Sequence, residues 1–285
     1  MKIRLLYTVF CVLSSWLVAF AAPETKIVVT EIDKAILHQK FDQFSKDQHL
    51  STGALMLKIG LDFKGTSYIG KTLDRTPEEN LVINLHELDC TTFVENCLAI
   101  ARTIKNGQPD FEKFAAELQK IRYRNGVLNG YASRLHYFSE WITDNAAKGI
   151  VEDMTAKVGG INCPVSVSFM STHPEYYPQL KANSALINVI RQIENRISAK
   201  QYFFIPKEKI AAHEREMEDG DIIALVTRIS GMDVSHIGLA VKKQGRVFLL
   251  NASSKGAKVE TTQVLLADYL KDSKNTTGIF VVRAK

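Results

Sequence analysis

The sequence predicts an α+β fold in which a helical block is followed by an antiparallel sheet. Between about residues 84 and 148, apolar residues recur at helical spacing. From about residue 160, apolar segments become short and rich in β-branched residues. The chain has 285 residues, 46% of them hydrophobic and 24% charged, which is typical of a globular protein. We expect one folding unit over residues 22–285, with a helical lobe at 84–148 and a β-rich lobe at 160–285.

The first residues predict an export signal. Met1–Arg4 is positively charged, residues 5–20 are apolar, and Ala19–Ala21 offers a small-residue cleavage site. We expect a signal peptide over residues 1–21, a location in the periplasm and no stable membrane insertion after cleavage. The alternative of an uncleaved anchor is weaker, because the apolar run is shorter than the roughly 20 residues of a membrane span. The formal net charge of +5 is too small and too dispersed to indicate nucleic-acid binding.

The segments before the helical block give mixed patterns. After an extended stretch near residues 27–30, apolar residues at helical spacing predict a helix over 31–48. Three glycines divide residues 53–70 into short apolar pieces, which predicts a loop or short strand with one helical turn. β-branched residues predict a short strand over 81–85.

The helical block begins at Cys90. Its apolar face is formed by Cys90, Phe93, Val94, Cys97, Leu98 and Ala101. This i, i+3, i+4, i+7 spacing predicts a helix, and Asn106-Gly107 ends it. A second helix is expected from its N-cap Asp110 to Ile121, and a third over residues 133–145.

The second half reads mainly as strands. The predicted strands cover residues 165–169, 202–205, 221–227, 236–242, 246–251 and 279–283, and a helix is expected over 184–198. Gln244-Gly245 fits a tight hairpin turn between two of these strands.

Cys90 is a candidate nucleophile because it opens a predicted helix. Unpaired backbone N–H groups and the positive end of the helix dipole favour a thiolate at such a position. The alternative is a small buried hydrophobe, which is our interpretation of Cys97. Cys90 and Cys97 lie seven helical residues apart, roughly 10 Å, which is too far for a disulfide. Cys163 could pair with either, and the odd number leaves at least one free thiol.

His236 is the candidate base among seven histidines. It opens an apolar strand directly after a turn, which would hold the ring rigidly at the rim of a sheet. Asn251 ends the next strand, across the hairpin, within reach of the second ring nitrogen. The alternative is a core thiol with two polar residues at a sheet edge. His86-Glu87 and His213-Glu214 are interpreted as surface residues, and no zinc motif is present, so no metal or other cofactor is expected.

Three motifs carry a resemblance to a known family. They are the run from Leu88 to Val94, the run from Glu218 to Ile223 and the run from Ser235 to Leu239. In this order they resemble the Asp-Cys-Ser/Thr turn, the Gly-Asp-hydrophobic strand and the histidine strand of the NlpC/P60 cysteine hydrolases. The longer blocks 84–96, 122–126, 133–138 and 251–254 are similar to one branch, the DUF1460 or AmiA-like N-acetylmuramoyl-L-alanine amidases.

The resemblance implies a papain-like core in which Cys90 is the nucleophile, His236 the base and Asn251 the orienting residue. Many NlpC/P60 members carry histidine at the third position, so asparagine is a departure from the family pattern. Tyr68 resembles the family tyrosine that helps to stabilise the oxyanion, and the alternative is an aromatic core residue. Candidate substrate-binding residues are Asp89, Ser235, Arg134, His136, Tyr137 and Trp141. Tyr137 and Trp141 are equally well explained as core residues of the third predicted helix.

The branch implies cleavage of the amide bond between N-acetylmuramic acid, preferentially its 1,6-anhydro form, and L-alanine in soluble peptidoglycan fragments. Two other functions stay open. A γ-D-glutamyl-diamino-acid endopeptidase on the same fold would use the same catalytic residues. A non-catalytic envelope-binding protein would keep the shape without the chemistry, and the retained cysteine and histidine argue against it.

Overall fold

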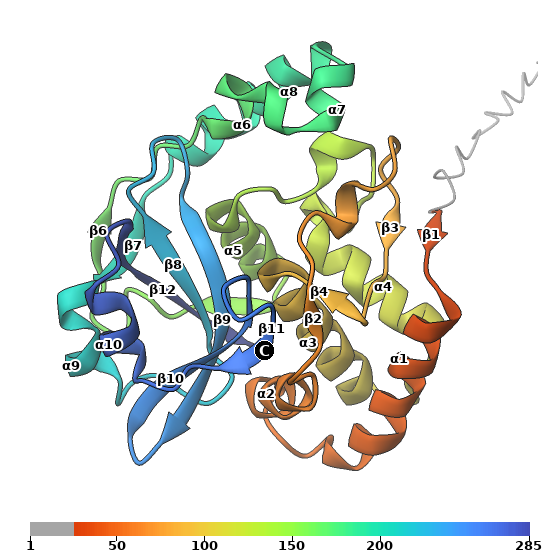
Figure 1. The fold of residues 1–285 in the computed structure, drawn as a ribbon, viewed down its shortest axis with the longest axis vertical. Helices are drawn as coiled ribbons and strands as arrows, with labels where there is room; N and C mark the ends of the chain where they lie inside the picture. Colours follow the sequence, from red (N-terminus) through yellow and green to blue (C-terminus); the bar gives the residue numbers. More distant parts are fainter. Residues whose placement is uncertain (1–25) are drawn as a thin grey trace, which may run out of the picture.

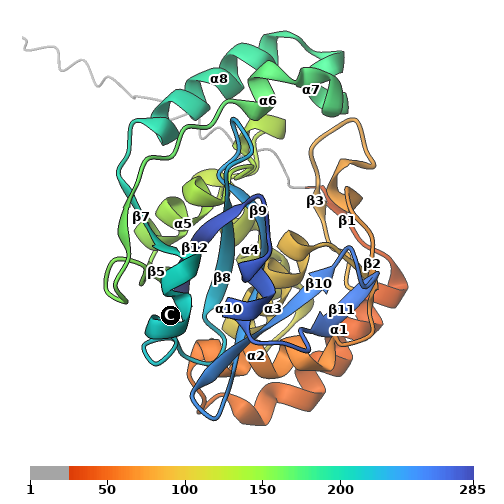
Figure 2. The ribbon, with the colours of Figure 1, turned by 60° about the vertical axis from the view of Figure 1, so that its left-hand side comes forward.

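A computed structural model describes residues 26–285, which form an α+β structure around one large sheet (Figure 1). The predicted signal peptide and Cys11 lie outside the described residues. Helices cover both faces of the sheet, and a further group of helices lies at the upper end of the molecule as drawn (Figure 2). In residues 26–285, no helix combines the length and the hydropathy that a membrane crossing requires.

The main sheet contains ten strands of the described chain and is mostly antiparallel. Nine follow the order β4-β2-β11-β10-β9-β8-β12-β7-β6, and β5 pairs with β12. Their bounds are β2 Ser67–Tyr68, β4 Glu87–Leu88, β5 Val151–Asp153, β6 Ile161–Cys163, β7 Tyr202–Pro206, β8 Ile222–Thr227, β9 Val234–Lys243, β10 Arg246–Ser253, β11 Lys258–Thr261 and β12 Thr276–Ala284. Only the β2–β4 pair is parallel within this sheet. A separate parallel pair joins β1 (Ile27–Val28) to β3 (Leu81–Val82).

The helices divide between the two faces of the sheet and the upper end. Their bounds are α1 Glu31–Phe44, α2 Thr52–Asp62, α3 Cys90–Lys105, α4 Phe111–Arg122, α5 Phe138–Ala147, α6 Phe169–Thr172, α7 Pro178–Ala182, α8 Ala185–Ser198, α9 Ile210–His213 and α10 Leu266–Lys271. Helices α2 and α3 pack on β9, and their core includes Leu239 and Leu250. Helix α10 packs on the opposite face, against a smaller core that includes Ala240 and Leu249.

Helix α3 forms where the sequence predicts it. Asp89 is the N-cap, and it forms a capping box with Thr92, whose backbone N–H donates to the Asp89 carboxylate at 2.8 Å. Phe93, Val94 and Cys97 of the predicted apolar face are fully buried. The helix ends at Lys105 with Asn106 as C-cap. Local capping and the apolar stripe therefore fix Cys90 as the first residue of α3.

The prediction of a loop or short strand with one helical turn over residues 53–70 is wrong for its first part, because Thr52–Asp62 is the helix α2. A short strand is present in its last part, where Ser67–Tyr68 forms β2. Ser51 caps this helix through a hydrogen bond from the backbone N–H of Ala54. Gly60 does not break α2 but lets it approach the sheet. A Cβ at this glycine would lie 3.1 Å from side-chain atoms of Leu239 and Leu250. The glycine signal thus reflects close packing rather than a turn.

Two further boundaries differ from the prediction. Helix α5 begins at Phe138 rather than at residue 133, since Tyr131–Ser133 forms a short 3-10 turn of its own. Residues 165–169 do not form a strand; Val167 makes one isolated bridge to Gly231, and the strand lies earlier at β6. The short elements β5, β11 and α10 carry too few residues for a periodic signal and were not predicted.

The remaining predicted elements of the second half are confirmed to within a few residues. Helix α8 and strands β7, β8, β9, β10 and β12 overlap the predicted ranges. Gln244 and Gly245 both have positive φ, 51° and 77°, as a tight hairpin turn requires. The hairpin brings the start of β9 and the end of β10 side by side, which matters for the site described next.

Candidate active site

Cys90 lies at the junction of the helices and the sheet. It is the half-buried first residue of α3, and α3 packs on β9 and β10. The Cys90 thiol makes a hydrogen bond with the backbone of Ile237 in β9, the residue that follows His236. The fold therefore brings the thiol against the strand that carries the candidate base. Cys90, Cys97 and Cys163 are all free thiols.

The local environment keeps the Cys90 thiol protonated. Burial and, to a smaller extent, the Asp89 carboxylate raise its pKa to about 11, and hydrogen bonds with the Ile237 backbone and with the side chain and backbone of Thr91 oppose this shift. We expected the helix N-terminus to favour a thiolate. The structure differs because Cys90 is buried next to a negative N-cap residue. Ionisation of this thiol therefore requires a base that takes its proton.

His236 and Asn251 are in contact, as the hairpin spacing predicted. His236 Nε2 lies 2.8 Å from Asn251 Oδ1, across the β9–β10 hairpin. Burial lowers the pKa of His236, whereas the Asn251 hydrogen bond and the Asp89 charge raise it. Because the Asn251 oxygen accepts, Nε2 carries the proton and Nδ1 of the neutral ring is the basic nitrogen. The ring is thus half-buried, oriented and neutral near physiological pH.

Tyr68 and Asp89 complete the group around the thiol. Burial raises the pKa of Tyr68, and the charges of Cys90 and Asp89 raise it further, so the phenol lies within electrostatic range of both. Strand β2 places it there by pairing with β4, in register Tyr68 to Leu88, two residues before Cys90. The charge of Asp89 raises the pKa of Cys90, of His236 and of Tyr68. The Asp89 carboxylate also caps α3. This structural role explains its position even if it does not contact a substrate.

Comparison with known proteins identifies the family. Residues 58–279 match the family model described as AmiA-like, N-acetylmuramoyl-L-alanine amidase-like. The chain belongs to this family. Membership implies an amidase-like hydrolase with a peptidoglycan-related substrate. No curated protein matches the chain.

Solved structures agree with this assignment. An N-acetylmuramoyl-L-alanine amidase from Bacteroides uniformis is 39% identical, with a TM-score of 0.79 over 82% of this chain and 99% of that one. A Bacteroides fragilis protein named as a xylanase candidate is 43% identical, with a TM-score of 0.76 over 80% and 99%. A Legionella pneumophila protein of family DUF1460 is 21% identical, with a TM-score of 0.63 over 88% and 96%, and shares the fold.

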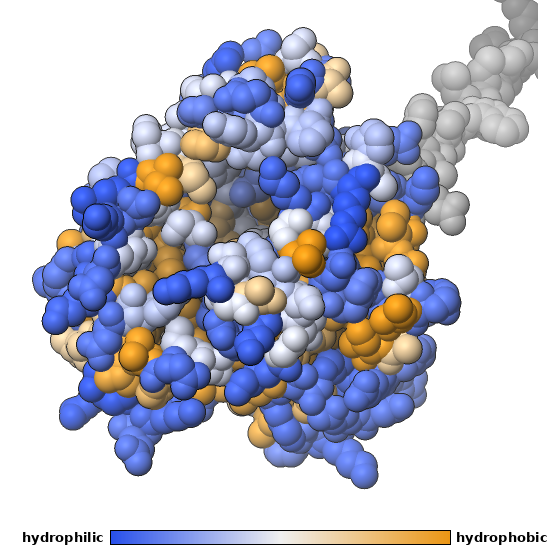
Figure 3. All heavy atoms as spheres, viewed as in Figure 1, coloured by the Kyte–Doolittle hydropathy of each residue, from blue (hydrophilic) through white to orange (hydrophobic). Residues whose placement is uncertain are grey.

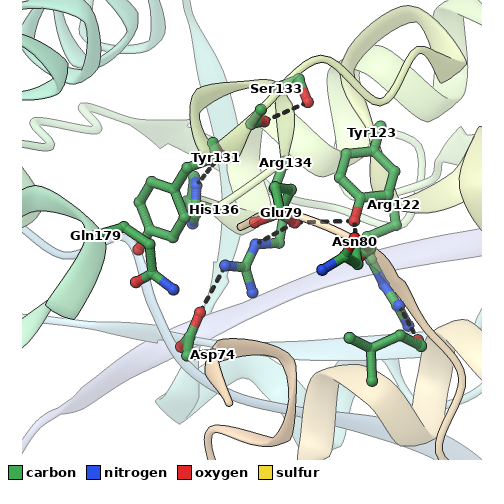
Figure 4. A network of polar contacts seen from close by, with 12 residues as sticks. Asp74, Glu79, Asn80, Arg122, Tyr123, Tyr131, Ser133, Arg134, His136 and Gln179 are labelled. Carbon is green, nitrogen blue, oxygen red and sulfur yellow. Dashed lines mark hydrogen bonds and ion pairs between the residues drawn. The ribbon is translucent and has the colours of Figure 1, made fainter. Parts of the chain in front are cut away.

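Arg134 and His136 of this amidase-like chain lie in a network of polar contacts (Figure 4). The Arg134 guanidinium is buried and forms ion pairs with Asp74 at 2.6 Å and Glu79 at 3.2 Å. His136 Nε2 lies 2.9 Å from the Tyr131 carbonyl, and burial, aided by the Arg134 charge, lowers the pKa of His136 to about 3. The His136 ring is therefore neutral and half-buried, and the Arg134 guanidinium is held by the two carboxylates.

Tyr137 and Trp141 are core residues, as the alternative interpretation held. Trp141 is 1% exposed, stacks on Phe138 and donates its indole N–H to Glu95 at 3.2 Å. The Tyr137 hydroxyl donates to Glu194 at 2.7 Å. Neither side chain has a free face for a sugar ring in this structure. Ser235, in contrast, is exposed on β9 beside His236.

Asp233 is a residue that the sequence analysis missed. Its buried carboxylate accepts hydrogen bonds from the backbone N–H and the hydroxyl of Ser139, both at 2.7 Å. These bonds tie the start of β9 to the first turn of α5, 94 residues apart in sequence. No periodic signal marks such a contact. In the sequence, the only indication of this contact was an aspartate three residues before the candidate histidine.

A second missed contact involves His86, which was interpreted as a surface residue. His86 Nδ1 lies 2.7 Å from the carboxylate of the buried Asp33. The same Asp33 side chain accepts from the backbone N–H of Leu85 at 2.7 Å, so α1 anchors the segment that leads to Cys90. Glu214 is also buried, and it forms an ion pair with Arg246. Within residues 26–285, no cluster of three metal-ligating side chains occurs.

Proposed function

We propose that this protein is a cysteine amidase that hydrolyses the bond between N-acetylmuramic acid, preferentially its 1,6-anhydro form, and L-alanine in soluble peptidoglycan fragments. The family provides the peptidoglycan-related substrate. The Bacteroides uniformis relative, at 39% identity, is an N-acetylmuramoyl-L-alanine amidase by name. In this proposal, the junction of α3 with β9 and β10 is a papain-like NlpC/P60 core.

One observation carries the proposal. The Cys90 thiol is hydrogen-bonded to the backbone of Ile237, on the strand that carries His236. Asn251 Oδ1 lies 2.8 Å from Nε2 of that histidine. A nucleophile at a helix N-terminus, a base on a neighbouring strand and a third group that fixes the ring are the elements of a cysteine hydrolase site. The neutral asparagine orients the ring without adding a charge.

The chemistry proceeds through a thioester. His236 Nδ1 takes the proton of Cys90 as the sulfur adds to the lactyl carbonyl carbon, and the carbonyl oxygen becomes an oxyanion. The C–N bond then breaks, and His236 gives its proton to the leaving nitrogen of L-alanine. Water, activated by His236, attacks the thioester carbon, which releases the carboxylic acid and returns the proton to Cys90.

Because its pKa is raised, Cys90 is a neutral thiol before the reaction, and its proton moves to His236 as the sulfur attacks. A thiolate–imidazolium ion pair is not formed in advance. In this proposal, the Tyr68 hydroxyl and the Cys90 backbone N–H donate to the oxyanion. Asp89 and Ser235 lie at the edge of the same site and are proposed to contact the substrate. The predicted signal peptide supports a location in the periplasm, where soluble peptidoglycan fragments arise.

The decisive assay incubates the purified protein with anhydro-disaccharide peptide and analyses the products by mass spectrometry. We expect free disaccharide and a peptide that begins with L-alanine. Cleavage after D-glutamate would instead indicate the endopeptidase. Cys90→Ala should abolish turnover, and Cys97→Ala, a buried thiol on the same helix, is the matched control. A parallel incubation with xylan tests the activity suggested by the name of the Bacteroides fragilis relative. Hydrolysis of xylan without amide cleavage would refute the proposal.

A further inference from the structure

A buried carboxylate of α1 contacts the chain segment that leads to Cys90. Asp33 lies in the first turn of α1 and is 1% exposed. Its Oδ1 accepts the backbone N–H of Leu85 at 2.7 Å and lies 2.7 Å from His86 Nδ1. These partners are 52 and 53 residues away in sequence, and His86 comes four residues before Cys90. The proposed chemistry gives no role to Asp33 or to His86.

Both oxygens of the Asp33 carboxylate have partners inside the protein. Oδ2 accepts the backbone N–H of Thr30 at 3.2 Å and the Thr30 hydroxyl at 2.5 Å. Burial raises the pKa of Asp33, but the hydrogen bonds from Leu85, Thr30 and His86 outweigh burial, and the pKa lies below its ordinary value. Because the ionised carboxylate only accepts, His86 Nδ1 carries a proton, and the contact fixes the orientation of the ring.

The position of Asp33 indicates a structural contact rather than contact with a ligand. Helix α1 lies at the lower right of Figure 1, whereas the surface on this face is hollowed below the α6–α8 region (Figure 3). Burial of a carboxylate is costly unless its oxygens are hydrogen-bonded. The directional bonds that offset this cost fix Leu85 and His86 relative to α1.

The turn formed by residues 84–87 is also held from α3. The side-chain oxygen of Asn84 accepts the backbone N–H of Glu87 at 2.9 Å and that of His86 at 3.3 Å. The Asn84 carbonyl accepts from the side-chain amide of Asn96, on α3, at 3.0 Å. The 84–87 turn is therefore clamped between α1 on one side and α3 on the other, and this clamp sets the direction in which β4 begins.

Strand β4 carries this direction to the candidate site. It is the last strand in the order of the main sheet, so β2 alone pairs with it there, and Leu88 lies beside Tyr68. Cys90 follows two residues after Leu88. A displacement of the 84–87 turn therefore moves the thiol and the Tyr68 hydroxyl. His236 does not move with them, because it is held by the β9–β10 hairpin.

We propose that Asp33 and His86 are positioning residues for the nucleophile. Asp33 holds the His86 ring and the Leu85 backbone. The turn that contains them sets where Cys90 stands relative to the base and to the oxyanion donors. The assignment rests on the proposed amidase function, and it adds a support for the thiol that is independent of the β9–β10 hairpin.

Kinetics on the muramoyl peptide test the assignment. Asp33→Ala and His86→Ala should each lower kcat about 10- to 100-fold with KM little changed, because a thiol displaced by about 1 Å attacks poorly. The double variant should be no slower than Asp33→Ala, since His86 has then already lost its partner. His86→Asn should recover most of the rate, because its amide N–H replaces the ring N–H. Asp42→Ala and His38→Ala, on the exposed face of α1, are the matched controls.

Labelling of Cys90 with iodoacetamide tests the assignment without a substrate. His86→Ala should speed labelling several-fold, because the thiol leaves the buried place that raises its pKa. His86→Asn should restore the wild-type rate. The His86 side chain is 32% exposed, so its variants decide the matter even where Asp33→Ala does not fold.

Folded Asp33→Ala and His86→Ala proteins with wild-type kcat and wild-type labelling would overturn the positioning role, while the amidase function would stand on cleavage by the wild type. A loss of rate that His86→Asn does not recover also overturns the role, since the hydrogen bond is then not the cause. If the wild type does not cleave the muramoyl peptide, the proposed function fails, and the labelling rates alone decide whether Asp33 and His86 position the thiol.

Discussion

The two regions that meet at the candidate site are held in place in different ways. Cys90 is positioned by neighbours in sequence, since its N-cap Asp89 and the capping partner Thr92 lie within three residues. His236 is positioned by distant residues. Asn251 holds its ring from 15 residues away, and Asp233 ties its strand to Ser139 from 94 residues away. The nucleophile is thus fixed by local structure, and the base by tertiary contacts.

The two regions also differ in how burial acts on them. Burial raises the pKa of the acidic Cys90 thiol and lowers the pKa of the basic His236, because it disfavours the charged form of each group. Both groups are therefore neutral in the free protein near pH 7. Such a pair contributes to catalysis by transferring a proton during attack, and the predictions below separate the roles of its two sides.

The largest effect is expected when the base is removed. His236→Ala should lower kcat by about 10³-fold, because the neutral thiol of Cys90 then has no proton acceptor. Steady-state kinetics on the muramoyl peptide measure this. His38→Ala, which removes an exposed imidazole on α1, is the comparison. A His236→Ala protein with near-normal kcat would show that another group accepts the proton.

A smaller loss is expected when the orienting residue is removed. Asn251→Ala should reduce kcat by about 10- to 100-fold, because the ring of His236 loses the acceptor at Nε2. KM should change little. Asn251→Asp tests the same contact in the other direction: the added charge should raise the pKa of His236 and move the acidic limb of the pH–rate profile to higher pH. An unchanged profile in Asn251→Asp would place the asparagine outside the proton pathway.

The tertiary contact of β9 should matter for both stability and rate. Asp233→Ala removes the acceptor for the Ser139 backbone N–H and hydroxyl, which should cost about 1–3 kcal/mol of unfolding free energy. If this contact positions β9, kcat should also fall several-fold at temperatures where the variant is folded. Ser139→Ala, which keeps the backbone bond, should lose less of both. Equal stability and rate in Asp233→Ala and the wild type would show that the contact is not required.

The smallest effect is a shift in the ionisation of the thiol. Asp89→Asn keeps an N-cap residue but removes the charge that raises the pKa of Cys90. The pKa should fall, so iodoacetamide should label Cys90 faster at a given pH below 10, and the midpoint of the labelling rate should move to lower pH. Labelling of denatured protein provides the reference rate. A midpoint that stays at about 11 would leave burial as the sole cause of the raised pKa.

The sequence by itself determined the elements whose signals are local. Helix α3 and its cap, the β9–β10 hairpin and most long strands follow from periodicity, capping residues and turn residues. The predicted contact of Asn251 with His236 is present, since a two-residue turn fixes the register of its hairpin. The catalytic role of these residues stays a prediction.

Only the tertiary structure decided the features that depend on packing. Gly60 reads as a helix breaker until Leu239 and Leu250 are placed against it. The helix N-terminus favours a thiolate at Cys90, but burial, which no local pattern reports, raises the pKa of the thiol. Trp141 belongs to the core, because Glu95 and Phe138 occupy its polar and flat sides. Short-range signals in the sequence specify where a helix begins. The ionisation of the Cys90 thiol and the exposure of the Trp141 ring depend instead on residues that are distant in sequence and pack against them in the fold.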